Sequence, residues 1–431
     1  MNNNLHQPSN FLLKSLNKTS KSNILGHEKS SQRRWRIVLY SHDTMGLGHK
    51  RRNLLIAQNL GVSPLNADIL LITGTNQSNQ VDNSEGIDCV TLPALYKSGV
   101  GSYKAKHWQM SIDEIVKMRS HIILTTIQSF KPDILIVDNV PKGAMGELKP
   151  TLKYLKKETK TFCILGLRDI LDDPKTIYQE WKKAKNEQII RKYYDEVWIY
   201  GDPTIYDGIK EYKFSADILD KFRYTGYLDQ RTRLEFTSNK SSFKLKNKDV
   251  ALCMVGGGQD GANLALTFAQ TNFPDNVQGI IITGPFMPSE IQNKLFKIAK
   301  SRSNLWVWKY VKEPTLLLKE ARWVVSMGGY NSTSEILSFE KRALIIPRIN
   351  PRQEQLIRIK RLEKLGLADM LHPDNLTPDS LAQWLREKTN TPEVHKTLDF
   401  QGLTKIPLYL SRICDQIEGK NYPKTKLIAN V

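Results

Sequence analysis

Residues 36–75 read RIVLYSHDTMGLGHKRRNLLIAQNLGVSPLNADILLITGT. The apolar run RIVLYS at 36–41 is typical of a buried strand, and GLGHKRRNLLIAQNL at 46–60 reads as a loop that leads into an amphipathic helix. ADILLITGT at 67–75 is again strand-like. A strand, a glycine turn, a helix and a second strand in this order form a βαβ unit, which predicts an α/β fold with a parallel sheet.

The same pattern continues along both halves of the chain. Strand-like runs in the first half are CVTLPAL, PDILIVDNV, TFCILGLRD and EVWIYGD, with helical segments between them. A second series begins with VALCMVGGGQDGANLALTFAQ at 250–270 and continues with GIIITGP, NLWVWKYV, ARWVVSM and RALIIPR, followed by closing helices. The chain is therefore predicted to contain two Rossmann-like, doubly wound domains that face each other across a cleft.

The boundaries of these domains are expected where the pattern lapses. Residues 1–34, rich in Asn, Ser, Lys and Gln, are predicted to be a disordered basic tail. The N-terminal domain is expected at 35–228 and a polar linker at 229–248. The C-terminal domain is expected at 249–420, followed by a short tail at 421–431.

Length and composition support two hydrophobic cores, since the chain has 431 residues of which 40% are hydrophobic. No run approaches the roughly 18 to 20 apolar residues of a membrane span, and the N-terminus lacks the apolar core of a secretory signal. The four cysteines lie far apart without CxxC spacing, which indicates reduced thiols and no metal site. We therefore expect a cytoplasmic protein.

The formal net charge of +19 calls for a negatively charged partner. Basic residues are spread through both halves without a nucleic-acid-binding module, so no nucleic-acid partner is expected. An anionic or lipid-linked acceptor and peripheral contact with the inner face of an anionic membrane stay open, as does a merely solvated basic surface. Lys50, Arg51 and Arg52, beside the first glycine loop, fit an anionic acceptor.

The first loop whose residues are suited to binding or catalysis is SHDTMGLGHKRR at 41–52. Gly46 and Gly48 permit a tight turn, and the free amides at the start of the following helix favour an anion. His49 stands at the carboxyl end of a predicted parallel strand, where open α/β folds bind ligands. A tight turn with a half-exposed histidine is the structural alternative.

The second loop, VGGGQDGANLA, places Gly256, Gly257, Gly258 and Gly261 between a strand and a helix, which leaves backbone amides uncovered for a phosphate. These glycines also spell GxGxxG, for which a dinucleotide site requires an acidic residue at the end of the next strand. That strand ends in IIITGPF without an acidic residue, so an NAD-dependent dehydrogenase is disfavoured.

The third segment, SMGGYNSTSEIL, is another strand end, glycine turn and helix start. Asn331, Ser332 and Thr333 are expected to cap this helix while its amides face a phosphate. Ser332 and Glu335 also fit the spacing of a capping box, which is the structural alternative for both residues.

The fourth segment, PRINPRQEQLIRIKRLE, carries a carboxylate beside an amide at Glu354 and Gln355. Such a pair is suited to bind adjacent sugar hydroxyls, since each group forms more than one hydrogen bond. An exposed helix start with favourable negative charge explains the same residues without a ligand.

Together these motifs resemble the GT-B glycosyltransferases. The resemblance is to the lipid-linked N-acetylglucosaminyltransferase of bacterial peptidoglycan synthesis, which has a glycosyltransferase family 28 C-terminal domain, and to plant and animal UDP-dependent transferases. GGYNSTSE is similar to the CGWNSTLE core of the plant-type donor signature, and GGGQDGA is similar to the GGSxGA loop of the peptidoglycan enzyme. The likeness covers about residues 36–417. Met327 replaces a histidine of the plant-type signature, and Asp260 adds a negative charge near the expected phosphates.

The resemblance implies a role for each matching residue. His49 would be the base on the acceptor side, assisted by the loop glycines Gly46 and Gly48 and oriented by Asp138 of PDILIVDNV. Glu335 would bind the ribose, Glu354 and Gln355 the transferred sugar, and the segment around Val311 the nucleotide base. The implied donor-binding set is Gly256, Gly257, Gly258, Gln259, Gly261, Ala262, Val311, Gly328, Gly329, Asn331, Ser332, Thr333, Glu335, Glu354 and Gln355.

The expected activity is an inverting transfer of a hexose or N-acetylhexosamine from a nucleotide diphosphate sugar, such as a UDP-sugar, to an acceptor hydroxyl. Without a suitably placed DxD motif, no metal or other cofactor is expected, because helix amides replace the cation. Two alternatives stay open: a nucleotide-sugar 2-epimerase of the same fold, and a non-catalytic nucleotide-sugar-binding subunit. A paired His49 and Asp138 argue against the second.

Overall fold

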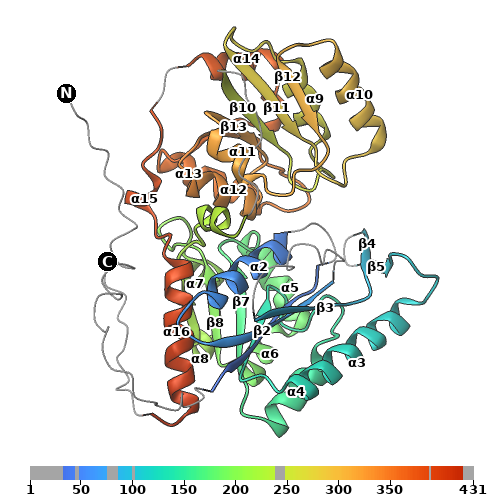
Figure 1. The fold of residues 1–431 in the computed structure, drawn as a ribbon, viewed down its shortest axis with the longest axis vertical. Helices are drawn as coiled ribbons and strands as arrows, with labels where there is room; N and C mark the ends of the chain where they lie inside the picture. Colours follow the sequence, from blue (N-terminus) through green and yellow to red (C-terminus); the bar gives the residue numbers. More distant parts are fainter. Residues whose placement is uncertain are drawn as a thin grey trace, which may run out of the picture. The chain divides into compact units, whose positions relative to one another are not determined.

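The computed structural model describes residues 33–43, 48–74, 86–99, 102–237, 248–387 and 390–420. Residues 34–431 belong to one structural unit, which contains two parallel sheets and a small hairpin. Figure 1 shows the strands of each sheet flanked by helices. The predicted α/β fold with two Rossmann-like domains is confirmed.

The first sheet has seven parallel strands in the order β3-β2-β1-β6-β7-β8-β9. Their bounds are β1 (Trp35–Ser41), β2 (Ala67–Thr73), β3 (Ile87–Thr91), β6 (Ile134–Asp138), β7 (Phe162–Arg168), β8 (Glu196–Tyr200) and β9 (Phe222–Tyr224). The central strands β1 and β6 are almost entirely buried, because helices cover both faces of the sheet.

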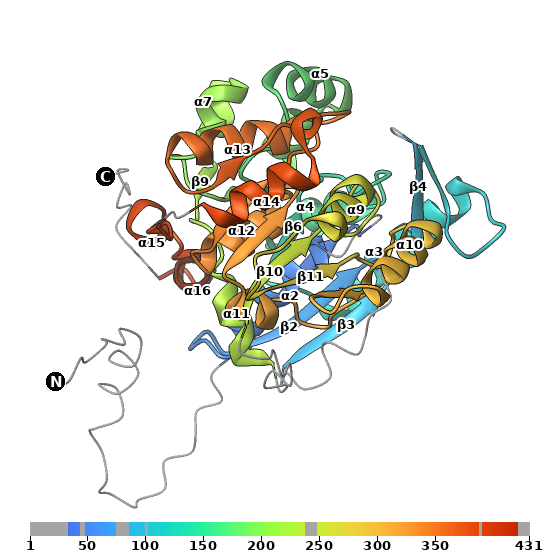
Figure 2. The same cartoon turned by 90° about the horizontal axis from the view of Figure 1, so that it is seen from above.

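Helices and a hairpin connect these strands. The helices are α2 (Gly48–Gly61), α3 (Ile112–Phe130), α4 (Lys149–Glu158), α5 (Pro174–Ala184), α6 (Asn186–Tyr193), α7 (Gly208–Tyr212) and α8 (Ala216–Leu219). Helix α2 packs on β1 and β2, whereas α3, α4 and α6 pack in sequence against one another. The hairpin of β4 (Leu95–Gly99) and β5 (Ser102–Ala105), which the sequence pattern did not predict, extends away from the sheet near β3 (Figures 1 and 2).

The second sheet has six parallel strands in the order β12-β11-β10-β13-β14-β15. Their bounds are β10 (Asp249–Met254), β11 (Val277–Ile282), β12 (Leu305–Trp308), β13 (Trp323–Ser326), β14 (Arg342–Ile345) and β15 (Asp369–Met370). Alternate residues of β10 serve different cores: Val250 and Leu252 join the larger core, whereas Ala251 and Cys253 join a second one. This alternation follows the two-residue period of a strand.

Helices of the second half cover both faces of its sheet, and the last of them packs against the first half of the chain. They are α9 (Ala262–Gln270), α10 (Ser289–Lys300), α11 (Thr315–Glu320), α12 (Tyr330–Ser338), α13 (Glu354–Lys364), η3 (Pro373–Asn375), α14 (Pro378–Arg386), α15 (Val394–Thr397) and α16 (Gly402–Ile417). Figure 2 shows α9 and α10 on one side of β10 and β11, and α12 and α13 on the other.

The last helix returns to the first sheet, although its sequence position is within the predicted C-terminal domain. Helix α16 packs against α2, and Asn59 donates a side-chain hydrogen bond to the carbonyl of Leu403 at 2.6 Å. The indole ring of Trp198 in β8 lies 6.0 Å from the ring of Tyr409 in α16. The two halves are therefore joined by a second crossing of the chain.

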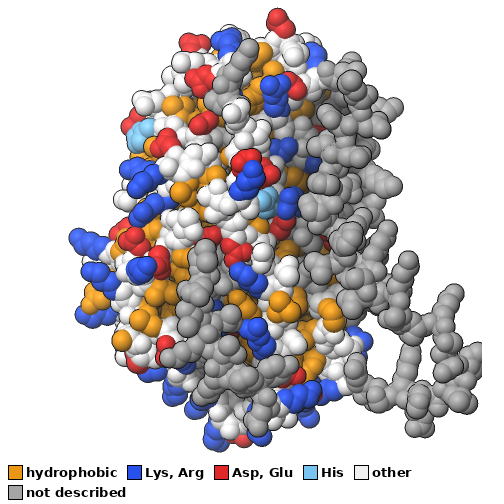
Figure 3. All heavy atoms as spheres, turned by 90° about the vertical axis from the view of Figure 1, so that its left-hand side faces the viewer, with side chains coloured by type: hydrophobic (Ala, Val, Ile, Leu, Met, Phe, Trp, Pro, Cys, Tyr) orange, Lys and Arg blue, Asp and Glu red, His pale blue; other side chains and the backbone are white. Residues whose placement is uncertain are grey.

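Part of the predicted linker is regular structure. Residues Gln230–Phe236 form the 3-10 helix η2, and the backbone amide of Gln230 donates to the hydroxyl of Ser338 in α12 at 3.0 Å. In the described part of the chain, no helix is long and apolar enough to cross a membrane. On the face drawn in Figure 3, basic side chains are scattered among acidic and hydrophobic ones.

Candidate active site

A cavity of about 420 Å³ is lined by loops that follow the strands of both sheets. Its wall includes Arg168 at the end of β7, the glycine loop after β10 and the glycine turn after β13. Open α/β sheets bind ligands at the carboxyl ends of their strands. The volume lies within the range of about 300 to 1,000 Å³ that is common for small-molecule sites.

Most of the predicted site residues line this cavity. They are Gly48, His49, Gly256, Gly257, Gly258, Gln259, Val311, Gly329, Asn331, Ser332, Glu335, Glu354 and Gln355. Gly261, Ala262, Gly328 and Thr333 belong to the same two loop and helix starts but do not form part of the wall. Asp138 lies behind His49, and Gly46 lies outside the described residues.

His49 and Asp138 form a direct side-chain contact. The imidazole Nδ1 lies 2.8 Å from Oδ2 of Asp138, which is fully buried at the end of β6. Burial raises the pKa of Asp138, but the charges of Arg52 and His49 outweigh it and hold that pKa well below its usual range. The carboxylate is therefore ionised and accepts a hydrogen bond from Nδ1–H, which leaves Nε2 to accept a proton.

Arg52 is the second partner of Asp138. Its Nη2 donates to Oδ1 at 2.5 Å, and its guanidinium lies 5.1 Å from the ring centre of Tyr330 and 5.5 Å from that of Tyr200. The same Nη2 lies 3.1 Å from Nδ1 of His49. An Nδ1–H that donates to Asp138 cannot also accept from Arg52, so we interpret this distance as an approach and not as a hydrogen bond.

A second histidine lies beside the first. The ring centres of His42 and His49 are 4.7 Å apart, and His42 is buried. Burial, followed by the charge of His49, lowers the pKa of His42 to about 4. His42 is therefore neutral near pH 7 and adds no positive charge beside His49.

The start of α2 is closed by Asp43. Its carboxylate accepts from the backbone amide of Lys50 at 3.0 Å and from the hydroxyl of Ser41 at 2.5 Å. The expectation that this helix start offers free amides to an anion is therefore wrong for Lys50. Gly48 packs against Asn331, since a Cβ at this position would lie 2.0 Å from Nδ2 of Asn331 and would displace that side chain.

The glycine loop before α9 has the open backbone that the sequence predicts. Gly256 and Gly258 adopt positive φ angles of 61° and 94°. The N-cap of α9 is Gly261, which has no side chain to bond the amides of the first turn. These amides are available to an anion at this end of the helix.

Helix α12 begins earlier than the sequence predicts. Its N-cap is Gly329, without a side-chain cap, and Asn331, Ser332 and Thr333 are already helical residues. The prediction that these residues cap the helix is wrong, and Ser332 and Glu335 form no capping box. The earlier start is fixed by Tyr330, whose buried hydroxyl donates to the carbonyl of Tyr200 at 2.8 Å.

Glu335 lies at the cavity wall in contact with the first half of the chain. Nη2 of Arg51 donates to Oε1 of Glu335 at 3.1 Å and to Oε1 of Glu313 at 3.0 Å. The carbonyl of Arg51 accepts from Arg233 of η2 at 2.7 Å. Arg51 therefore holds the predicted ribose-binding carboxylate from across the cavity.

Glu354 and Gln355 are organised by Arg348, which sequence reasoning missed. Arg348 donates through Nη2 to Oε1 of Glu354 at 2.7 Å and through its backbone amide to Oε1 of Gln355 at 2.9 Å. Oε2 of Glu354 is buried without a hydrogen-bond partner among the described residues. Arg348 also donates to Asp260 at 2.9 Å, which neutralises the acidic residue of the glycine loop.

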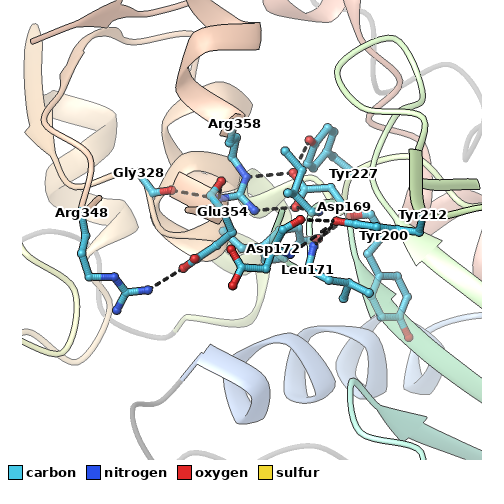
Figure 4. A network of polar contacts seen from close by, with 12 residues as sticks. Asp169, Leu171, Asp172, Tyr200, Tyr212, Tyr227, Gly328, Arg348, Glu354 and Arg358 are labelled. Carbon is cyan, nitrogen blue, oxygen red and sulfur yellow. Dashed lines mark hydrogen bonds and ion pairs between the residues drawn. The ribbon is translucent and has the colours of Figure 1, made fainter. Parts of the chain in front are cut away.

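A buried ion pair fixes the base of the site (Figure 4). Arg358 of α13 donates from Nε and Nη2 to the two carboxylate oxygens of Asp169 at 2.9 and 2.7 Å. Tyr227 donates to the same carboxylate at 2.7 Å, and Arg358 also donates to the carbonyl of Gly328 at 3.0 Å. The loop after β7 and the turn after β13 are thus held together.

Part of the chain matches known protein families. Residues 252–401 match the glycosyltransferase family 28 C-terminal domain. A curated relative from Shouchella clausii (strain KSM-K16), named UDP-N-acetylglucosamine--N-acetylmuramyl-(pentapeptide) pyrophosphoryl-undecaprenol N-acetylglucosamine transferase, is 30% identical over 170 residues. The match covers 38% of this chain and 46% of that protein, so the chain spans less than half of its relative.

Two solved structures share the fold over most of the chain. The glycosyltransferase SnogD from Streptomyces nogalater has a TM-score of 0.58 at 12% identity and covers 90% of this chain and 100% of its own. The UDP-GlcNAc 2-epimerase from Methanocaldococcus jannaschii also has a TM-score of 0.58 at 12% identity, with coverages of 88% and 100%. At these identities the likeness concerns the fold alone.

The predicted resemblance and fold class are thereby confirmed. The family match falls on the half of the chain that carries the two uncapped helix starts, Glu335, Glu354 and Gln355. The chain has the two-domain fold of the GT-B glycosyltransferases, and its residues 252–401 match the glycosyltransferase family 28 C-terminal domain.

Proposed function

We propose that this protein is a glycosyltransferase that moves a sugar from a nucleotide diphosphate donor to an acceptor hydroxyl. One observation carries the proposal. His49, held by the buried carboxylate of Asp138, lines the same cavity as the glycine loop before α9 and the start of α12. A base and a diphosphate site in one cavity are the two parts that sugar transfer requires.

The residues suggest how the reaction proceeds. Nε2 of His49 takes the proton of the acceptor hydroxyl, and Asp138 holds the imidazole and stabilises the imidazolium that forms. The acceptor oxygen then bonds to the anomeric carbon as the bond from that carbon to the phosphate oxygen breaks. The amides at the starts of α9 and α12 stabilise the departing diphosphate.

The donor is held by the second half of the chain. Glu335 accepts hydrogen bonds from the ribose hydroxyls, while its Oε1 continues to accept from Nη2 of Arg51. Oε2 of Glu354, buried and unpartnered among the described residues, accepts from a hydroxyl of the transferred sugar. Gln355 keeps its carbonyl oxygen on the amide of Arg348, so its NH₂ group donates to the sugar.

We further propose that the donor is a UDP-linked hexose or N-acetylhexosamine and that transfer is inverting and independent of a metal ion. Direct attack by one acceptor oxygen inverts the anomeric carbon. The helix amides supply the positive potential that a metal ion supplies elsewhere. An anionic or lipid-linked acceptor at the inner face of a membrane fits the net charge of +19, although Arg51 and Arg52 of α2 are themselves paired with carboxylates.

Calorimetric titration tests the proposal directly. The wild type, Glu335→Ala and His49→Ala are each titrated with UDP, UDP-glucose, UDP-N-acetylglucosamine, GDP-mannose and NAD. We expect UDP and one UDP-sugar to bind, the affinity to fall in Glu335→Ala, and His49→Ala to bind like the wild type. Binding of NAD alone would refute the transferase, and a transfer assay run with EDTA checks the metal independence.

The similarity to an epimerase structure supports one alternative, a nucleotide-sugar 2-epimerase. An epimerase alters the donor sugar without any acceptor, whereas a transferase leaves it intact or releases UDP by slow hydrolysis. Incubation of the protein with UDP-N-acetylglucosamine alone, followed by proton NMR of the sugar, separates the two. A 2-epimeric UDP-sugar in the wild type would favour the epimerase.

A further inference from the structure

Four arginines line the cavity, and three of them are paired with carboxylates. Arg51 binds Glu313 and Glu335, Arg52 binds Asp138, and Arg348 binds Asp260 and Glu354. Arg168 is different. It makes no side-chain hydrogen bond or ion pair within the described residues, and its Nε is buried without a partner.

The carboxylates near Arg168 each accept hydrogen bonds from another arginine. Asp169, the next residue in the chain, accepts two hydrogen bonds from Arg358 and one from Tyr227 (Figure 4). Oε1 of Glu354 accepts from Arg348. Burial lowers the pKa of Arg168, and Glu354 is the charge that most opposes this effect. A guanidinium nevertheless remains protonated in proteins, so Arg168 is a positive charge at the cavity wall that has no counterion in hydrogen-bonding contact among the described residues.

We propose that Arg168 recognises an acidic substrate, by pairing with a carboxylate or phosphate group carried on a sugar next to the reacting centre. This inference rests on the proposed function and narrows its substrate class. Buried charges in proteins are paired, and a planar guanidinium matches the two oxygens of a carboxylate or phosphate. The substrate therefore supplies the counterion that the described part of the chain does not.

A second unsatisfied group points to the same ligand. Oε2 of Glu354 is a buried acceptor without a donor among the described residues, and Glu354 lines the same cavity as Arg168. One acidic sugar satisfies both groups, because its hydroxyl donates to Glu354 while its anionic group accepts from Arg168. Two sources provide this chemistry: a hexuronic acid on the donor, or an acidic sugar or sugar phosphate as the acceptor.

Matched ligands distinguish the sources. UDP-glucuronic acid and UDP-glucose differ only in a carboxylate at C6, and both are titrated into the wild type, Arg168→Gln and Arg168→Lys. Protein saturated with UDP is then tested by NMR with methyl glucuronide, glucose 6-phosphate and methyl glucoside as acceptor probes. Arg361→Gln removes one exposed positive charge outside the cavity and is the control for net charge.

Either among the two UDP-sugars or among the acceptor probes, we expect the wild type to bind the acidic ligand about 10-fold or more tightly than the neutral one. This is the difference expected for a charge-assisted bidentate pair. Arg168→Gln should lose this preference, Arg168→Lys should keep part of it, and Arg361→Gln should keep all of it. Preference for UDP-glucuronic acid shows that the donor carries the acidic group. Preference for an acidic acceptor probe shows that the acceptor carries it. No preference in the wild type, or an equal preference in Arg168→Gln, overturns the proposal.

The outcome is separable from that of the proposed function. If neither UDP nor any UDP-sugar binds, the transferase fails, while the acceptor probes, added to the protein without UDP, still test Arg168. Loss of this partly buried charge, which is unpaired among the described residues, should leave the melting temperature of Arg168→Gln equal to or above that of the wild type. A lower melting temperature would indicate a structural role, and the ligand preference of the wild type alone would then decide.

Discussion

Nδ1 of His49 lies 2.8 Å from Oδ2 of Asp138, and this contact joins the start of α2 to the end of β6 in the middle of the first sheet. The two residues are separated by 89 positions in the chain, and the parallel pairing of β1 with β6 brings them together. The arrangement gives the imidazole one fixed tautomer, because the ionised carboxylate accepts from Nδ1–H.

The first prediction concerns this pair. His49→Ala should lower kcat by about 10²- to 10⁴-fold, the usual contribution of a general base, with little change in KM for the donor. Release of UDP from the donor, measured by a coupled assay, provides the rate. Asp138→Asn should also lower kcat while UDP still binds. A His49→Ala enzyme with unchanged kcat would remove His49 from the mechanism.

The ion pair of Asp169 with Arg358 leads to a second prediction. Both side chains are about 1% exposed, so Arg358→Gln leaves a buried carboxylate with only Tyr227 and a backbone amide as donors. We expect a loss of about 3 to 5 kcal/mol in the free energy of unfolding, measured with urea. The double variant Asp169→Asn/Arg358→Gln should lose less than the single variant. Equal losses would show that the charge itself is not the cause.

The fold was predictable because its parallel strands are continuous apolar runs that end in glycine turns. Short strands escaped this pattern: β15 has two residues and β9 has three, so neither is long enough to show a period. The return of α16 to the first sheet was also missed. An amphipathic helix reveals which of its faces is buried, but not which sheet covers that face.

The site was predictable where a local motif exists, as for the glycine loop before α9 and for His49. The role of Arg168 was not predictable. An arginine at a strand end has no distinguishing local pattern. That Arg168 is unpaired among the described residues depends on partners far away in the chain: Asp169 accepts from Arg358, 189 positions away, and Glu354 accepts from Arg348. Such a residue is recognised only when the structure shows the partners of all neighbouring charged side chains.

The third prediction compares two glycines of the donor loop. A Cβ at Gly258 would lie 2.2 Å from the carbonyl oxygen of Thr283, whereas a Cβ at Gly256 meets nothing within 4 Å. Both residues have positive φ, so either alanine variant carries the backbone strain of about 1 to 2 kcal/mol for a left-handed residue. Gly258→Ala should in addition distort the loop. We expect a larger fall in UDP affinity and melting temperature for Gly258→Ala than for Gly256→Ala, and equal effects would contradict this account.

The fourth prediction concerns acid stability and His42. Its pKa is lowered to about 4 in the folded protein from 6.5, because burial and the neighbouring His49 outweigh the carboxylates of Asp43 and Asp138. As the pH falls below about 6.5, the unfolded chain takes up the proton before the folded chain does. The stability that depends on neutral His42 is therefore complete above that pH and is lost progressively down to about pH 4.

His42→Gln does not titrate at this position, so its free energy of unfolding should fall less steeply over the same interval. The two proteins are compared by urea unfolding at steps from pH 8 to pH 4, with the difference at pH 8 as the baseline. Relative to that baseline the wild type should lose up to about 3 kcal/mol more than the variant by pH 4, at about 1.4 kcal/mol for each pH unit of the interval. Parallel curves would mean that the pKa of His42 is the same in the folded and the unfolded protein, and that burial does not keep this imidazole neutral beside His49.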